Sequence, residues 1–274
     1  LTLTLTLTLT LTLTLTLTLT LTRTLTNSAM APIVREVRAT GASWCYKAAC
    51  DHLRGAGLSG LVAEHGAEEK SIQRWCGAEP FACDGQGVFT ALSRAIVYQQ
   101  LAGAAADTIY GRFLGIFGGA PPTPEALMAH GMAIRSAGLS QRKAEYLLDL
   151  ASAVADGRID AARIPTLTEE ELQEMLCGVR GIGPWTVDMF MMFTMKRPDV
   201  LPSGDLGIRK GAKVHFELGS LPNATELATL TERWRPYRTL GCWFLYKVAD
   251  QAKPDKRKPK PKAKAKAKAK AKAK

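Results

Sequence analysis

The chain has 274 residues and a formal net charge of +11, from 36 Lys and Arg residues against 25 Asp and Glu residues. The segment 253–274 holds twelve of the basic residues and one acidic residue, Asp255, so it carries the whole net charge and the rest of the chain sums to zero. No run of about 20 consecutive apolar residues occurs, which excludes a membrane-spanning helix and predicts no membrane partner. The six cysteines lack the close spacing of a zinc ribbon or an iron–sulfur cluster, so we expect no metal.

Both ends of the chain are of low complexity. Residues 1–26 alternate Leu and Thr except at Arg23, and the first methionine is Met30. We expect residues 1–29 to be disordered, or to be an artefact of translating a simple-sequence repeat upstream of a start at Met30. The tail 253–274 consists mainly of Lys, Pro and Ala, has nothing apolar to bury, and is predicted to be disordered. Such a tail could hold DNA or chromatin without sequence preference by releasing counterions, or could be a solvated segment with no partner.

The remaining segment, 38–252, has the pattern of one helical domain. Apolar residues recur at intervals of three and four, and no stretch shows the strict alternation of a strand. Thr168 and Glu171 have the spacing of a capping box, and Thr123 and Ser140 stand where N-caps do. The predicted fold class is therefore all-α. Helices are expected within 41–76, over 89–101 and 107–117, and from Thr123, Ser140, Thr168, Pro184, Asp205 and Pro236.

A Gly-x-Gly turn lies between two of the predicted helices. Glycine adopts left-handed backbone angles and lets the main chain approach another surface closely. The helix from Pro184 would point its free N–H groups and positive dipole end at that surface, where a phosphate is the natural occupant. The alternative is a plain turn between packed helices. The predicted hairpin residues, of which only Arg180 is basic, are Val179, Arg180, Gly181, Ile182 and Gly183.

Three segments, in this order, resemble the helix-hairpin-helix (HhH-GPD) DNA glycosylases, and within them the alkylation-repair branch of the DNA-3-methyladenine glycosylase II type. The segments are 95–101, 138–144 and 179–211, and the similarity covers roughly residues 85–250. The resemblance implies two helical lobes with a helix-hairpin-helix and a lesion-binding cleft between them. We expect a monomer that binds double-stranded DNA containing damaged bases. The basic tail suits the nucleus, with a plastid or mitochondrion as the alternative location.

The resemblance places the family's catalytic carboxylate at Asp205, a short distance after the hairpin. Breaking an N-glycosidic bond builds positive charge on the sugar, which a fixed carboxylate stabilises. The same group can orient or deprotonate the attacking water. The alternative is that Asp205 only caps the helix that begins at Leu206, because Asp is a good N-cap residue. Asp188, on the helix after the hairpin, is interpreted as structural.

Relatives that also nick the DNA strand carry a lysine two residues beyond the second glycine of the hairpin, where this chain has Trp185. No amine for a Schiff base is therefore present at this position. The chain is predicted to be a monofunctional glycosylase that removes bases of the 3-methyladenine and 7-methylguanine type, leaves an abasic site and has no lyase activity. No cofactor is expected, although a monovalent cation could bridge hairpin carbonyls and a DNA phosphate.

A target base must leave the stack and enter a pocket, where electron-rich rings favour a cationic alkylated base. The candidates for this base pocket are Trp185, Tyr246, Trp234 and Tyr237. Trp185 could instead only support the site, and the aromatic residues Trp243 and Phe244 of the last helix are interpreted as core. The wedge that fills the hole left by the base is Gln100 or Leu101; the alternative is a polar helix end that bonds to the backbone.

Two other functions remain open on the sequence alone. One is a glycosylase of the same fold that acts on another lesion, such as an oxidised purine or a mismatched base. The other is a DNA- or chromatin-binding protein with a basic tail, whose cleft has no catalytic activity. Release of alkylated bases separates the first alternative from the predicted activity, and Asp205→Asn separates an enzyme from a binder.

Overall fold

The computed structural model describes residues 45–66 and 85–252, so the predictions for 1–29 and 253–274 lie outside it. Every regular element in the two described ranges is helical and no strand occurs there, which confirms the all-α fold class. None of the helices in this part of the chain is long and apolar enough to cross a membrane. The elements are α2 (Tyr46–Leu53), η1 (Arg54–Leu58), α3 (Ser59–His65), α5 (Gly85–Tyr98), α6 (Gly103–Ile116), α7 (Pro124–His130), η2 (Gly131–Ala137), α8 (Gln141–Ala155), η3 (Ile164–Thr166), α9 (Glu169–Cys177), α10 (Pro184–Met189), η4 (Phe190–Thr194), α11 (Leu206–His215), α12 (Ala224–Thr231), η5 (Glu232–Trp234) and α13 (Arg238–Gln251).

The predicted N-caps begin helices as expected. The side chains of Thr123 and Ser140 each accept a hydrogen bond from the main-chain N–H three residues further on. Thr168 forms a complete capping box. Such caps satisfy N–H groups that have no partner inside the helix. Two differences concern the end of the chain: the last helix begins at Arg238, two residues later than predicted, and α12 lies in a segment for which the sequence predicted no helix.

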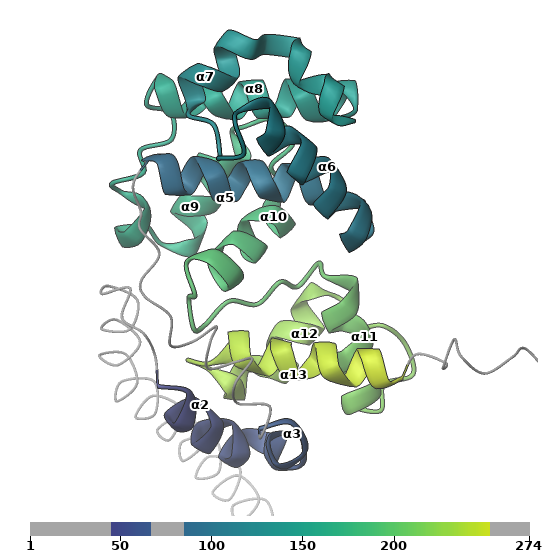
Figure 1. Ribbon diagram of the computed structural model, residues 1–274. Helices are drawn as coiled ribbons and strands as arrows, with labels where there is room; N and C mark the ends of the chain where they lie inside the picture. The colour runs from purple at the N-terminus through teal and green to yellow at the C-terminus, as the bar shows by residue number, and fades with distance from the viewer. Residues whose placement is uncertain (1–44, 67–84, 253–274) are drawn as a thin grey trace, which may run out of the picture.

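The helices α5 to α10 form one group, drawn in the upper part of Figure 1. Helix α5 packs against α6 and α8, and α8 packs against α7. The apolar residues of α5 recur every three or four positions, so they form one buried face. The buried apolar residues of α5 are Val88, Phe89, Leu92, Ile96 and Val97. Because α10 follows α9 directly through the hairpin, this group holds both the hairpin and the turn after α5.

The second group consists of α11, α12 and α13, with α3 against α13 (Figure 1). Gly207 and Gly211 lie one turn apart on α11 and face α13. A Cβ on Gly211 would run into the carbonyl oxygen of Leu245, and one on Gly207 would lie 2.8 Å from Cε1 of Tyr246. The absence of side chains at these two positions lets the helices approach more closely than larger residues allow. This contact fixes the N-terminus of α11, where Asp205 lies.

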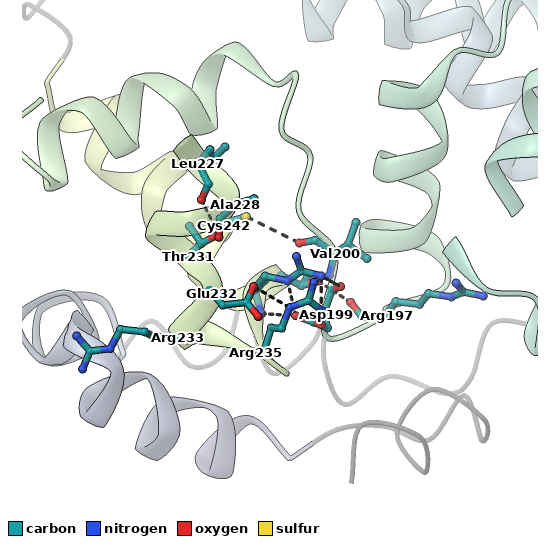
Figure 2. Close-up of polar contacts among 12 residues, drawn as sticks. Arg197, Asp199, Val200, Leu227, Ala228, Thr231, Glu232, Arg233, Arg235 and Cys242 are labelled. Carbon is teal, nitrogen blue, oxygen red and sulfur yellow. Dashed lines mark hydrogen bonds and ion pairs between the residues drawn. The ribbon is translucent and has the colours of Figure 1, made fainter. Parts of the chain in front are cut away.

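Polar bonds fix the connecting segment between η4 and α11 to the second group. The buried carboxylate of Asp199 accepts hydrogen bonds from Nη1 of Arg235 at 2.8 Å and from Nε of Arg238 at 2.6 Å. Figure 2 shows Asp199 at the centre of this cluster, beside Arg235. The side chain of Thr239 bonds to the main chain of the same segment. Because a buried carboxylate is costly unless it is paired, the two arginines identify Asp199 as a structural anchor.

Candidate active site

Asp205 lies where the connecting segment ends and α11 begins, and its two carboxylate oxygens have different partners. Oδ1 accepts a hydrogen bond from the main-chain N–H of Ile208 at 2.8 Å, so Asp205 is the N-cap of α11. Oδ2 accepts one from Nε1 of Trp185 at 2.7 Å. The residue is 8% exposed. The two interpretations of Asp205, helix cap and reactive carboxylate, are compatible, since each oxygen of an ionised carboxylate has a second lone pair.

Trp185 joins the two groups of helices at this point, because it lies in the first turn of α10 and bonds to the residue before α11. Its side chain is 47% exposed, although large apolar rings are usually buried. The N–H edge of the indole is bound to Asp205, while much of the ring remains accessible. Leu206, next to the carboxylate, is also exposed. An open aromatic ring beside a carboxylate suits a planar, positively charged ligand.

Tyr246 completes this site from α13. Its ring lies against Gly207, where an added Cβ would be 2.8 Å from Cε1 of the tyrosine. Burial, followed by the negative charge of Asp205, raises the pKa of the Tyr246 phenol, so the hydroxyl keeps its proton. Trp185 and Tyr246 were both predicted from the sequence to line a pocket, and the structure places both beside Asp205.

The other two predicted pocket residues, Trp234 and Tyr237, have different surroundings. Trp234 is 1% exposed, stacks on Phe216 with ring centroids 5.8 Å apart, and lies over Gly241. The prediction that Trp234 lines the pocket is therefore corrected: its ring fills the core of the second group. Tyr237 is half-buried and packs edge-on against His52, with ring centroids 5.6 Å apart, so its ring faces α2.

A second buried carboxylate, Asp188, lies on α10 one turn beyond Trp185. Nε2 of Gln173 donates a hydrogen bond to its Oδ1 at 3.1 Å. Burial raises the pKa of Asp188 to about 7; the Gln173 hydrogen bond lowers it, and the charges of Glu169 and Asp205 raise it further. The sequence interpretation of Asp188 as structural missed this property, because it arises from how α9 and α11 surround the side chain and no local motif signals it.

The hairpin between α9 and α10 directs its apolar side chains inward. Val179 and Ile182 are buried, whereas the side chain of Arg180 is exposed. Gly181 has the expected left-handed conformation, with φ +85°, and Gly183 is extended, with φ −108°. No atom lies within 4 Å of the position that a Cβ on Gly183 would take. The main chain at Gly183 is therefore open to the outside, as a backbone-binding turn requires.

The two wedge candidates lie in the turn that follows α5. Gln100 is exposed and has a left-handed backbone with φ +57°, and Leu101 is 37% exposed. The side chain of their neighbour Gln99 reaches the hairpin, since its Nε2 donates to the carbonyl oxygen of Gly181 at 2.8 Å. Gln99 is thus an anchor to the hairpin, and Gln100 and Leu101 are the accessible residues of the turn.

Comparison with known proteins shows the family to which the chain belongs. The model of the HhH-GPD superfamily base excision DNA repair proteins matches residues 93–236. DNA-3-methyladenine glycosylase 1 of Schizosaccharomyces pombe is 38% identical over 173 residues, which cover 61% of this chain and 76% of that protein. A 3-methyladenine DNA glycosylase of the same yeast, solved in complex with abasic DNA, matches with a TM-score of 0.60 and 33% identity, and covers 74% of this chain and 97% of that one. A DNA-3-methyladenine glycosidase of Bacillus halodurans matches with a TM-score of 0.56 and 34% identity, over 69% of this chain and 87% of that one.

The chain belongs to the HhH-GPD superfamily of base excision DNA repair proteins. Within the superfamily its place is the branch of the DNA-3-methyladenine glycosylases, as the similarity to the yeast and Bacillus proteins shows. Both conclusions confirm the resemblance drawn from the three sequence segments. The matched residues 93–236 include the turn after α5, the hairpin, Trp185 and Asp205.

Proposed function

We propose that the protein is a monofunctional DNA glycosylase that excises alkylated bases, of the 3-methyladenine and 7-methylguanine type, in base excision repair. The observation that carries the proposal is the pair formed by Trp185 and Asp205, in which an exposed aromatic ring orients a buried carboxylate. The relatives in yeast and Bacillus are named as 3-methyladenine glycosylases, and these names support the same class of substrate.

The carboxylate of Asp205 supplies the chemistry in this proposal. An alkylated base carries a positive charge, so its bond to the sugar is already weakened and its electron pair leaves with the base. Positive charge then builds on the sugar, and the fixed carboxylate stabilises it. Asp205 next accepts a proton from the attacking water, whose oxygen bonds to C1′ of the sugar. The products are the free base and an abasic site in an intact strand.

The ring of Trp185 and the phenol of Tyr246 account for base recognition. A cationic base stacked on an electron-rich ring gains up to about 2 kcal/mol when water is excluded. A neutral base gains much less from the same ring. The neutral Tyr246 hydroxyl adds a polar group at the edge of the site. A pocket of this kind selects positive charge more than shape, which suits several alkylated purines.

The hairpin from Val179 to Gly183 binds the DNA backbone in this proposal. The open main chain at Gly183 and the N-terminus of α10 favour a phosphate, and contacts of this kind position DNA without reading its sequence. The chain outside 253–274 has no net charge, so the basic tail would supply the long-range attraction to DNA.

The position of Trp185 also predicts that the strand stays intact. A lyase needs an amine that forms a Schiff base with the sugar, and an indole nitrogen does not do so. Duplex DNA containing one alkylated base, incubated with the protein, should therefore break only after alkali treatment. Strand breaks without alkali would contradict the monofunctional part of the proposal.

The proposal as a whole is tested by incubating methylated DNA with the protein and measuring released 3-methyladenine and 7-methylguanine. Asp205→Asn should lower the release rate by about 10²-fold or more and leave DNA binding intact. Release of only oxidised or mismatched bases from other substrates would favour a different lesion. DNA binding without release of any base would favour a binding protein.

A further inference from the structure

The C-terminal end of α5 is held by a lysine from another helix. Nζ of Lys143, on α8, donates hydrogen bonds to the carbonyl oxygens of Val97 at 2.6 Å and of Gln99 at 2.8 Å. The last carbonyls of a helix have no partner within the helix, and a cation there also opposes the helix dipole. Lys143 is partly buried, and this burial lowers the pKa of its ammonium group. Lys143 therefore fixes the main chain at the start of the turn that follows α5.

The turn also bonds to the hairpin. Nε2 of Gln99 donates to the carbonyl oxygen of Gly181 at 2.8 Å and lies 3.4 Å from Oγ1 of Thr186. Lys143 therefore holds the main chain of Gln99, while the side chain of Gln99 contacts the proposed DNA-binding hairpin. The two elements that would touch DNA are joined through one residue.

One face of α8 supports both elements. Lys143, Tyr146 and Asp149 follow one another at intervals of three, which places them along the same side of a helix. The ring of Tyr146 lies against Gly181, and Oδ2 of Asp149 accepts a hydrogen bond from the main-chain N–H of Arg180 at 2.8 Å. The distance between the turn after α5 and the hairpin is therefore set by a single rigid helix.

The turn needs such support, because one of its residues has an unfavourable backbone conformation. Gln100 has φ +57°, a left-handed conformation that is unfavourable for residues other than glycine. Leu101 is exposed, so burial of its side chain does not offset this conformational cost. Two hydrogen bonds from a charged donor are enough to offset this cost.

We propose that Lys143 is a positioning residue that holds Gln100 and Leu101 ready to fill the gap left by an extruded base. The proposal rests on the proposed function, in which a base leaves the DNA helix. A lysine suits the role because one ammonium has three donors and can reach two carbonyls at once. The residue acts through the turn and touches neither the base nor the sugar.

Insertion of the turn is measured with a duplex that contains an abasic-site analogue opposite 2-aminopurine, because the fluorescence of 2-aminopurine depends on its stacking. Wild-type protein should change the fluorescence on binding. Lys143→Met should bind within about threefold of wild-type affinity and lose most of the fluorescence change, since the hairpin contacts remain. Lys47→Met, an exposed lysine on α2, is the matched control and should behave as wild type.

Excision rates give a second readout. Extrusion is hardest from a well-paired site, so Lys143→Met should slow release of an alkylated base from a matched pair by about tenfold and from a mispaired site by less than about twofold. Equal slowing on both substrates, or an unchanged fluorescence signal, would overturn the proposal. If Lys143→Met does not fold, Lys143→Gln takes its place, because the shorter neutral side chain does not reach both carbonyls.

The two proposals can fail separately. If the wild-type protein releases no base from either duplex but the fluorescence change depends on Lys143, the proposed function fails and the positioning role stands. If the wild-type protein releases alkylated bases but causes no fluorescence change, the turn does not enter the helix and the positioning role is overturned.

Discussion

The indole of Trp185 and the carboxylate of Asp205 meet across the two groups of helices, with Nε1 donating to Oδ2 over 2.7 Å. One partner follows the hairpin and the other precedes α11, so the bond links the proposed backbone-binding element to the proposed reactive group. Trp185 is also the residue from which we predict an intact strand, because its indole nitrogen donates a hydrogen bond here and does not form a Schiff base.

The first prediction concerns this bond. Trp185→Phe keeps an aromatic ring and removes the N–H donor. A hydrogen bond to a charged acceptor is worth about 1.5–3 kcal/mol, so the single-turnover excision rate should fall by about 10- to 100-fold. Trp185→Ala should in addition weaken binding of DNA that contains a cationic base, because the ring is lost. Trp243→Phe on α13 is the matched control and should leave both quantities unchanged. A Trp185→Phe rate equal to that of wild type would show that the bond does not orient Asp205.

The second prediction separates the two hairpin glycines. Gly181 has a left-handed backbone and lies against the ring of Tyr146, so Gly181→Ala should lower the free energy of unfolding by about 1–3 kcal/mol. Gly183 is extended and has open space around it, so Gly183→Ala should stay within about 0.5 kcal/mol of wild type. Urea denaturation measures both changes.

Gly183→Ala should nevertheless weaken binding to undamaged duplex DNA, because its methyl group would stand where a phosphate approaches. Equal DNA affinity of Gly183→Ala and wild type would argue against the hairpin as the contact.

Much of the fold could be predicted because its signals are local. Caps such as Thr123, Ser140 and Thr168 lie within three residues of the N–H groups that they satisfy. The contact between α11 and α13 gave no such signal. Gly207 and Gly211 look like ordinary helix-weakening glycines in the sequence, and their reason is a neighbour more than thirty residues further along the chain.

The candidate site shows the same division. The hairpin and Asp205 were recognisable because each belongs to a motif of contiguous residues. The four aromatic candidates could not be told apart in this way, since whether a ring lines a pocket or fills a core depends on what packs against it. Trp234 stacks on Phe216 and is enclosed, whereas Trp185 has a polar partner at one edge and remains open.

The third prediction tests the contact between α11 and α13. Gly211→Ala places a methyl group against the main-chain carbonyl of Leu245, which cannot move without shifting α13. The variant should be less stable by about 2–4 kcal/mol. Gly207→Ala meets the ring of Tyr246 and lies 3.1 Å from Oδ1 of Asp205, so it should lose less stability and more activity. Thermal unfolding and excision rates, measured together, distinguish the two variants. The reverse order of effects would contradict this view of the contact.

The fourth prediction follows from the pKa of Asp188, which burial raises from 3.8 to about 7. Between these values the folded protein keeps a proton that the unfolded chain has released, so the free energy of unfolding falls as the pH rises through this window and stays low above it. Asp188→Asn has no such proton, and its amide oxygen can still accept the hydrogen bond from Gln173. The stability of the variant relative to wild type should therefore increase by about 2–3 kcal/mol between pH 5 and pH 8.

Urea denaturation of both proteins at pH 5, 6, 7 and 8 measures this difference. Glu174→Gln, an exposed carboxylate on α9, is the matched control, and its stability relative to wild type should not change across the window. A difference between Asp188→Asn and wild type that is the same at every pH would mean that Asp188 titrates in its ordinary range. A difference that grows between pH 6 and 8 would mean that Asp188 gains its negative charge near neutral pH, where this charge acts on the carboxylate of Asp205. Asp188→Asn would then also flatten the pH dependence of base release, because Asp205 would no longer face a second charge that appears as the pH rises.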